Sequence, residues 1–118
     1  MIPRLVAVIA LVLASAAGAA SPGWLGFSMS AEVNFLMKLD GATVNKVFKD
    51  SPAERAGIAA GDQILEVEGC AIPGCGAPKA KSLMERPAGS TVHLKLRRQS
   101  GEEYAVALVA EAGPTARR

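Results

Sequence analysis

The segment Asp50–Gly69, DSPAERAGIAAGDQILEVEG, constrains the fold more strongly than any other part of the chain. Ser51 is a favourable N-cap, Pro52 suits the first position of a helix, and Glu54 completes an S-x-x-E capping box. Gly57 stands where a left-handed residue ends a helix, so we expect a helix of about one and a half turns. A Gly-Asp turn and a short apolar strand follow. The segment therefore predicts a helix, a turn and a strand in direct succession.

Other segments have the apolar alternation or the β-branched composition of strands. They are Trp24–Met29, Val33–Leu39, Thr43–Phe48, Thr91–Arg97 and Glu103–Val109. Asp40-Gly41 is typical of a hairpin turn, which would place this turn between the second and the third of these segments. Ser100-Gly101 predicts a second turn, so the last two segments should form a closing hairpin.

A second helix is predicted over Lys79–Arg86. Ala80, Leu83 and Met84 would form its apolar face, and a proline and a glycine would end it. The order of elements indicates a small α+β domain. We expect a partly open β-barrel or sandwich of five to seven strands with two helices at its sides.

The beginning of the chain has the pattern of a secretory signal peptide. Arg4 supplies positive charge, Leu5–Ala14 is apolar, and Ala17-Gly18-Ala19 fits a cleavage site. The apolar run is shorter than the ~20 residues of a membrane-spanning helix, which makes an uncleaved anchor the less favoured alternative. We expect a periplasmic or secreted protein that does not stay inserted in a membrane after cleavage. The expected organisation is a signal peptide at 1–20, a folded domain at 21–110 and a disordered tail at 111–118.

Two cysteines, Cys70 and Cys75, are the only ones in the chain. In an exported protein a close, even pair predicts a disulfide that closes a small loop. A redox dithiol and half of a metal site are the alternatives. Redox pairs usually have the spacing C-x-x-C, and a zinc site would need further ligands although His93 is the only histidine.

Charge and motif content exclude several classes of function. Thirteen Lys and Arg stand against eleven Asp and Glu, which gives no sign of nucleic-acid binding. The chain has no phosphate-binding loop, no dinucleotide-binding glycine pattern and no motif for a metal. His93 is expected on the outward face of a strand, with no nucleophile indicated beside it. The sequence therefore predicts neither an enzyme nor a cofactor.

Two motifs at a characteristic spacing resemble those of PDZ domains. Trp24-Leu25-Gly26-Phe27 is similar to the x-Φ-G-Φ loop of that family, and Asp50–Gly69 is similar to a pattern of its bacterial branch. The resemblance covers nearly all of the chain after the signal. It implies the circularly permuted, bacterial arrangement of a single exported PDZ domain, in which the final strand, Glu103–Val109, replaces the strand that precedes the loop in animal domains.

The resemblance also implies a peptide site. Its carboxylate-binding loop would be Trp24, Leu25, Gly26 and Phe27, its groove strand would contain Ser28 and Met29, and its groove helix would contribute Lys81, Leu83 and Met84. Successive backbone amides in a tight loop can hold a peptide carboxylate, and a strand edge can pair with an extended peptide. The alternative for Leu83 and Met84 is an ordinary place in the core. Leu25 and Phe27 could likewise be core residues, with Gly26 an ordinary turn glycine. The start of the helix carries Ala77, Pro78 and Lys79 where many animal domains have a specificity-determining histidine, so no ligand class is carried over.

The function implied is that of a stand-alone adaptor that binds C-terminal or extended segments of other envelope proteins. A separate protease or a secretion component would be a suitable partner. The alternative is an assembly module that works through self-association or a fixed partner and binds no free peptide. Binding of free C-terminal peptides would distinguish the two functions.

Overall fold

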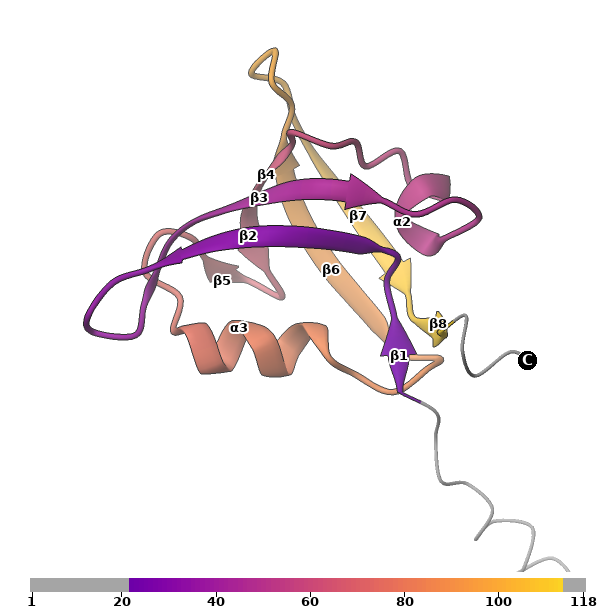
Figure 1. The fold of residues 1–118 in the computed structure, drawn as a ribbon, viewed down its shortest axis with the longest axis horizontal. Helices are drawn as coiled ribbons and strands as arrows, with labels where there is room; N and C mark the ends of the chain where they lie inside the picture. Colours follow the sequence, from indigo (N-terminus) through magenta and orange to yellow (C-terminus); the bar gives the residue numbers. More distant parts are fainter. Residues whose placement is uncertain (1–21, 114–118) are drawn as a thin grey trace, which may run out of the picture.

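The computed structural model describes residues 22–113, whose strands form one large antiparallel sheet and one small one (Figure 1). The large sheet has the order β2-β3-β4-β6-β7, with β5 beside β4, and a two-stranded sheet pairs β1 with β8. The strands are β1 (Gly23–Trp24), β2 (Phe27–Val33), β3 (Leu39–Val47), β4 (Gln63–Val67), β5 (Cys70–Ala71), β6 (Thr91–Arg97), β7 (Glu103–Val109) and β8 (Glu111–Ala112). The expected small α+β fold with two helices is confirmed, and the large sheet is open. Five strands have five or more residues and three have two.

Within the described residues two helices accompany the sheet, α2 (Pro52–Arg55) and α3 (Ala77–Met84). The Ser51 Oγ accepts a hydrogen bond from the Glu54 N–H at 3.1 Å, as expected of the N-cap. Figure 1 shows α3 beneath β2, whereas α2 lies beyond the end of β3, next to β7. The two helices therefore cover different parts of the domain.

The core is built from the inward faces of β3, β4 and β6 together with single residues of β7, the loops and the helices. Val92, Leu94 and Leu96 are all buried, which confirms the alternation expected for β6. The largest fully buried side chains also include Ile64, Leu108, Val44 and Val67. Burial of apolar surface of this kind is the main stabilising contribution to such a domain.

The first hairpin turn differs from its prediction. The turn lies between Val33 and Leu39, and Asp40 and Gly41 belong to β3, so the expected second extended segment and the Asp-Gly turn were wrong. The side chain of Asn34 is the physical reason. Its Oδ1 accepts hydrogen bonds from the N–H groups of Leu36, at 2.9 Å, and Lys38, at 3.1 Å, which closes the turn locally.

Two residues expected in the tail belong to the folded part. Glu111 and Ala112 form β8, which pairs with Trp24 and Gly23 of β1. The expected signal peptide at 1–20 and the residues after 113 lie outside the described part of the chain. Within residues 22–113, no helix is long and apolar enough to cross a membrane.

Asp62 is a buried acid that joins residues of three segments near α2 by hydrogen bonds. Asp62 is 2% exposed, and its Oδ2 accepts hydrogen bonds from the Ala59 N–H at 3.1 Å, from the Arg98 Nη1 at 2.8 Å and from the Tyr104 hydroxyl. The Arg98 guanidinium also lies over the Tyr104 ring, 3.9 Å from its centroid. Burial, and then the bond to Asp62, raise the pKa of Tyr104 well above its ordinary value.

The raised pKa of Tyr104 predicts the alkaline behaviour of the protein. The stabilising contribution of the protonated phenol is complete below the unfolded pKa near 10 and is lost as the pH rises toward the higher folded value. Tyr104 is the single tyrosine, so absorbance at 295 nm follows it alone. We expect ionisation well above pH 10 in the native protein and near pH 10 in urea. Equal midpoints in the two conditions would contradict both the burial of the Tyr104 hydroxyl and its bond to Asp62.

Candidate peptide-binding groove

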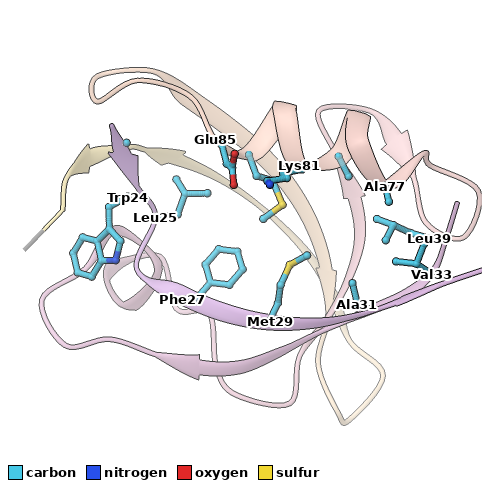
Figure 2. Close-up of a pocket in the computed structure, with 13 residues that line it drawn as sticks. Trp24, Leu25, Phe27, Met29, Ala31, Val33, Leu39, Ala77, Lys81 and Glu85 are labelled. Atoms are coloured by element: carbon cyan, nitrogen blue, oxygen red, sulfur yellow. The ribbon is translucent and has the colours of Figure 1, made fainter. Parts of the chain in front are cut away.

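An apolar groove of about 360 Å³ lies between β2 and α3 (Figure 2). Figure 2 shows Phe27 and Met29 projecting from β2 toward Lys81, with Trp24 at one end of the groove. Val33 and Leu39 lie at the other end. The lining residues are Gly23, Trp24, Leu25, Phe27, Met29, Ala31, Val33, Leu39, Ala77, Ala80, Lys81, Met84 and Glu85. Clefts that are mainly apolar, with a few polar groups at the rim, are typical of ligand sites.

The wall formed by β2 follows from the alternation of side chains along a strand. Residues 27, 29, 31 and 33 share one face and line the groove, and Ser28 points to the opposite side, where it is exposed. β2 pairs with β3 and stands at the end of the strand order. Within the described residues, one edge of β2 therefore has no neighbouring strand.

The backbone of Phe27 is directed toward this open edge. Phe27 of β2 lies opposite Val47 of β3. The residues next to this pair are joined by a hydrogen bond, because the Phe48 N–H donates to the Gly26 C=O at 2.8 Å. This pattern makes Phe27 and Val47 a pair that exchanges no hydrogen bonds with each other. The N–H and C=O of Phe27 consequently point away from β3.

The loop before β2 is fixed through its carbonyl groups. The C=O of Leu25 accepts from the Ala53 N–H at 2.9 Å, and the C=O of Gly26 accepts from Phe48. The N–H groups of Leu25 and Gly26 donate to no group within residues 22–113. Anchored carbonyls with available N–H groups form a small cluster of donors suited to an anion.

Gly26 is required by both its conformation and its surroundings. Its φ is +91°, a region that residues with a side chain rarely adopt. A Cβ atom on Gly26 would overlap the side chain of Ser51, whose Oγ donates to the Phe48 C=O at 2.6 Å and lies 3.3 Å from the Gly26 C=O. The two sequence motifs therefore meet in space, because the N-cap of α2 packs directly on the glycine of the loop.

The wall formed by α3 begins and ends two residues earlier than predicted. Pro78 stands in the first turn of the helix, where its missing N–H is tolerated, so the helix starts at Ala77 and not at Lys79. Lys81 and Met84 line the groove, and Leu83 does not. Leu83 is partly buried against the core, in agreement with the alternative considered for it.

Aromatic and charged side chains lie near the loop end of the groove. The rings of Trp24 and Phe48 are 6.0 Å apart with an interplanar angle of 47°, and the Lys46 Nζ lies 4.9 Å from the centroid of Phe48. Lys81 and Glu85 carry opposite charges on the α3 side. The groove is therefore lined mainly by apolar side chains, and Lys81 and Glu85 are the charged residues among them.

The far end of the groove is held by the disulfide loop. Cys70 and Cys75 form the predicted disulfide. The Leu39 N–H donates to the Cys75 C=O at 2.7 Å, and the Ala77 N–H donates to the Met37 C=O, also at 2.7 Å. These bonds fix the start of α3 beside the β2–β3 hairpin, and so they set the separation of the two walls at this end.

The sequence located the loop end of the groove better than its far end. Trp24, Leu25, Phe27 and Met29 all line it, whereas Gly26 and Ser28 do not. Lining residues that were missed are Gly23, Ala31, Val33, Leu39, Ala77, Ala80 and Glu85. Continuing the two-residue period of β2 past Met29 would have found two of them, and a helix starting at Ala77 would have found others.

The groove combines backbone amide donors, an open strand edge and mainly apolar side chains. This combination suits an extended peptide with a terminal carboxylate. Within residues 22–113, no group of three or more His, Cys, Asp or Glu side chains could hold a metal ion.

Comparison with known proteins agrees with this geometry. The family profile "PDZ domain" matches residues 15–97. The chain is 36% identical over 104 residues to the "Probable periplasmic serine endoprotease DegP-like" of Marinomonas sp. (strain MWYL1). This match covers 82% of the chain. The chain spans about a fifth of the length of that relative, 22%.

Solved structures of similar fold include domains of proteases. A photosystem II D1 C-terminal processing protease superposes with a TM-score of 0.65 at 23% identity, over 79% of this chain and 24% of that one. The HtrA3 PDZ domain bound to a phage-derived ligand, FGRWV, superposes with a TM-score of 0.55 at 25% identity. That match covers 75% of this chain and 85% of the other. With its profile match, its relative and its fold in agreement, the chain belongs to the PDZ domain family.

Proposed function

We propose that this domain is an exported adaptor that binds the C-terminal or extended segments of other envelope proteins. The bound segment adds to the open edge of β2 and lies in the groove against α3. The observation that carries the proposal is the position of the groove beside an unpaired strand edge, with amide donors at one end.

The backbone N–H groups of the loop would bind the terminal carboxylate of the peptide. The N–H groups of Leu25 and Gly26, together with that of Phe27 at the open edge, would donate to a terminal carboxylate. Hydrogen bonds to a charged acceptor are about twice as strong as neutral ones. The bonds of the loop carbonyls to Phe48 and Ala53 support this role, because they hold the loop in place before a ligand arrives.

The apolar residues of the groove would contact the side chains of the bound peptide. The last side chain of the peptide would lie among Leu25, Phe27 and Met84, which favours an apolar residue there. The third residue from the end would face Met29 and Ala77. With alanine at the helix start, this position has no side-chain donor that would select a hydroxyl group.

Export and partners follow from the sequence of the chain and from its relative. The expected signal peptide and the periplasmic relative support a place in the cell envelope. The matched relatives are proteases whose length this chain covers only in part, so a separate protease is a suitable partner, as is a secretion component. The role proposed for this chain is binding without catalysis.

The test is binding of fluorescent C-terminal peptides from a random library to residues 21–118, measured by anisotropy. Changing the terminal carboxylate to a carboxamide should weaken binding at least about tenfold, because the amide donors lose their charged acceptor. Ala31→Tyr should also weaken binding strongly, since a large side chain fills the middle of the groove.

The matched control is Ser28→Tyr, which places the same side chain on the opposite, exposed face of β2. It should leave binding unchanged. Equal binding of the carboxylate and carboxamide peptides would refute carboxylate capture. A folded domain that binds no peptide and self-associates in sedimentation would favour the assembly module.

A further inference from the structure

The β2–β3 hairpin displays apolar side chains to solvent. Within residues 22–113, five large apolar side chains are exposed, and four of them lie on this hairpin. They are Val33, Phe35, Leu36 and Met37, exposed by 47%, 92%, 62% and 57%. We call these four residues the apolar tip. An exposed cluster of this kind marks a surface that another molecule covers.

The apolar tip is held in one conformation by polar bonds. The Asn34 N–H donates to the Lys38 C=O at 2.9 Å, and the Asn34 Nδ2 donates to the Asp40 Oδ1 at 3.0 Å. Met37 takes a left-handed φ of +63°, and its C=O is bonded to Ala77 of α3. The hydrogen bonds of the turn therefore keep these apolar side chains exposed. Because the backbone of the turn is already ordered, a ligand that binds the tip loses little entropy in ordering it.

The apolar tip continues the groove at its far end. Val33 belongs to both, and Leu39, the first residue after the turn, also lines the groove. A peptide added antiparallel to β2, with its last residue beside Phe27, would place every second upstream residue beside Met29, Ala31 and Val33. Residues about six to eight positions before its end would then reach the tip.

We propose that the apolar tip binds the upstream part of the same peptide and selects an apolar residue about six to eight positions before the carboxylate. The inference rests on the proposed function, and it adds a second recognition element to it. The ligand class is thus an extended segment of eight or more residues with apolar residues at both ends of the contact. Short C-terminal peptides would use the loop end of the groove and leave the tip uncovered.

Two other occupants fit the tip less well. A membrane surface is favoured by basic residues around an apolar cluster, but Glu32 and Asp40 outnumber Lys38 beside this turn. A stable dimer usually buries about 20 to 30 residues on each partner, which is at least about five times the four residues of the tip. The continuity with the groove favours the upstream peptide over both.

The experiment is selection from a library of random decapeptides displayed with free carboxylates, using the wild-type domain and the double variant Phe35→Ser/Leu36→Ser. Both side chains are exposed, so the variant should fold normally. Val109→Ser is the control, because Val109 is 53% exposed and does not line the groove. Sequencing reports the enrichment of residue types at each position.

We expect apolar enrichment at the last position and again about six to eight positions upstream, with only the upstream signal lost in the double variant. A selected decapeptide should bind wild type roughly tenfold more tightly than its last five residues alone. The pentapeptide should bind the wild type and both variants equally.

Enrichment at the last position without an upstream signal, or an upstream signal that survives in the double variant, would overturn the role of the tip and leave the proposed function intact. No enrichment at any position would overturn both. Wild-type binding to phosphatidylcholine–phosphatidylglycerol vesicles, or a dimer that the double variant abolishes, would assign the tip to a membrane or to a second copy.

Discussion

Asp62→Ala is expected to lower the free energy of unfolding by about 3 kcal/mol, because it leaves Arg98 and Tyr104 without their common acceptor. Asp62 is 2% exposed and receives three hydrogen bonds, so little water can replace the lost carboxylate. For a domain of this size, this corresponds to a fall in Tm of roughly 10–20 °C. Urea denaturation followed by the fluorescence of Trp24, the single tryptophan, measures the loss.

Two further variants make this prediction specific. Glu102→Ala removes an exposed carboxylate from the β6–β7 turn and should change stability by no more than about 0.5 kcal/mol. Tyr104→Phe removes one donor to Asp62 and should cost about 1 kcal/mol. In combination with Asp62→Ala its further cost should be smaller, since the two residues act through one bond. An Asp62→Ala domain as stable as Glu102→Ala would refute the network.

Gly26→Ala is expected to cost about 2–4 kcal/mol, the sum of an unfavourable left-handed backbone and the overlap with Ser51. The matched control is Gly101→Ala. Gly101 has a φ of +100° and no atom within 4 Å of an added Cβ, so its replacement should cost only the backbone part, about 1 kcal/mol. The difference between the two variants, measured in urea, isolates the contact with the N-cap of α2.

Ser51→Gly tests the same contact from the other side. Glycine is an acceptable N-cap, and it removes the Cβ and Oγ atoms, the two that the new methyl group would overlap. Gly26→Ala should therefore cost less in the Ser51→Gly background than in the wild type. An equal cost in both backgrounds would show that the backbone conformation, and not the contact with Ser51, makes the glycine necessary.

Local structure was predictable wherever a few neighbouring residues decide it. The bounds of β6 and β7, the Ser51 N-cap and the positive φ of Gly57 all agree with their predictions. Each depends on alternation or on dihedral preferences within one short segment. The first hairpin turn was missed because Asp40-Gly41 is a common turn dipeptide, whereas the Asn34 side chain closed the turn five residues earlier.

The candidate site was predictable in part. The residues before and within the first half of β2 were identified from the loop motif, but α3 was placed two residues too late and Leu83 was assigned to the groove. Whether a helix residue faces a groove or the core depends on where the helix starts and how it is rotated. A shift of two residues turns a helix by about 200°, so small errors in the bounds exchange its faces.

The family, the disulfide, the capped helix and the closing hairpin could be predicted from the amino-acid sequence, because each depends on short motifs of neighbouring residues. The folded structure was needed to find that Gly26 packs on Ser51, that Arg98 and Tyr104 share Asp62 as an acceptor, and that Val33 of the apolar tip also lines the groove. These contacts join segments that are far apart in the sequence or depend on the register of two strands. They follow from packing the whole sheet around one core, which no single segment specifies.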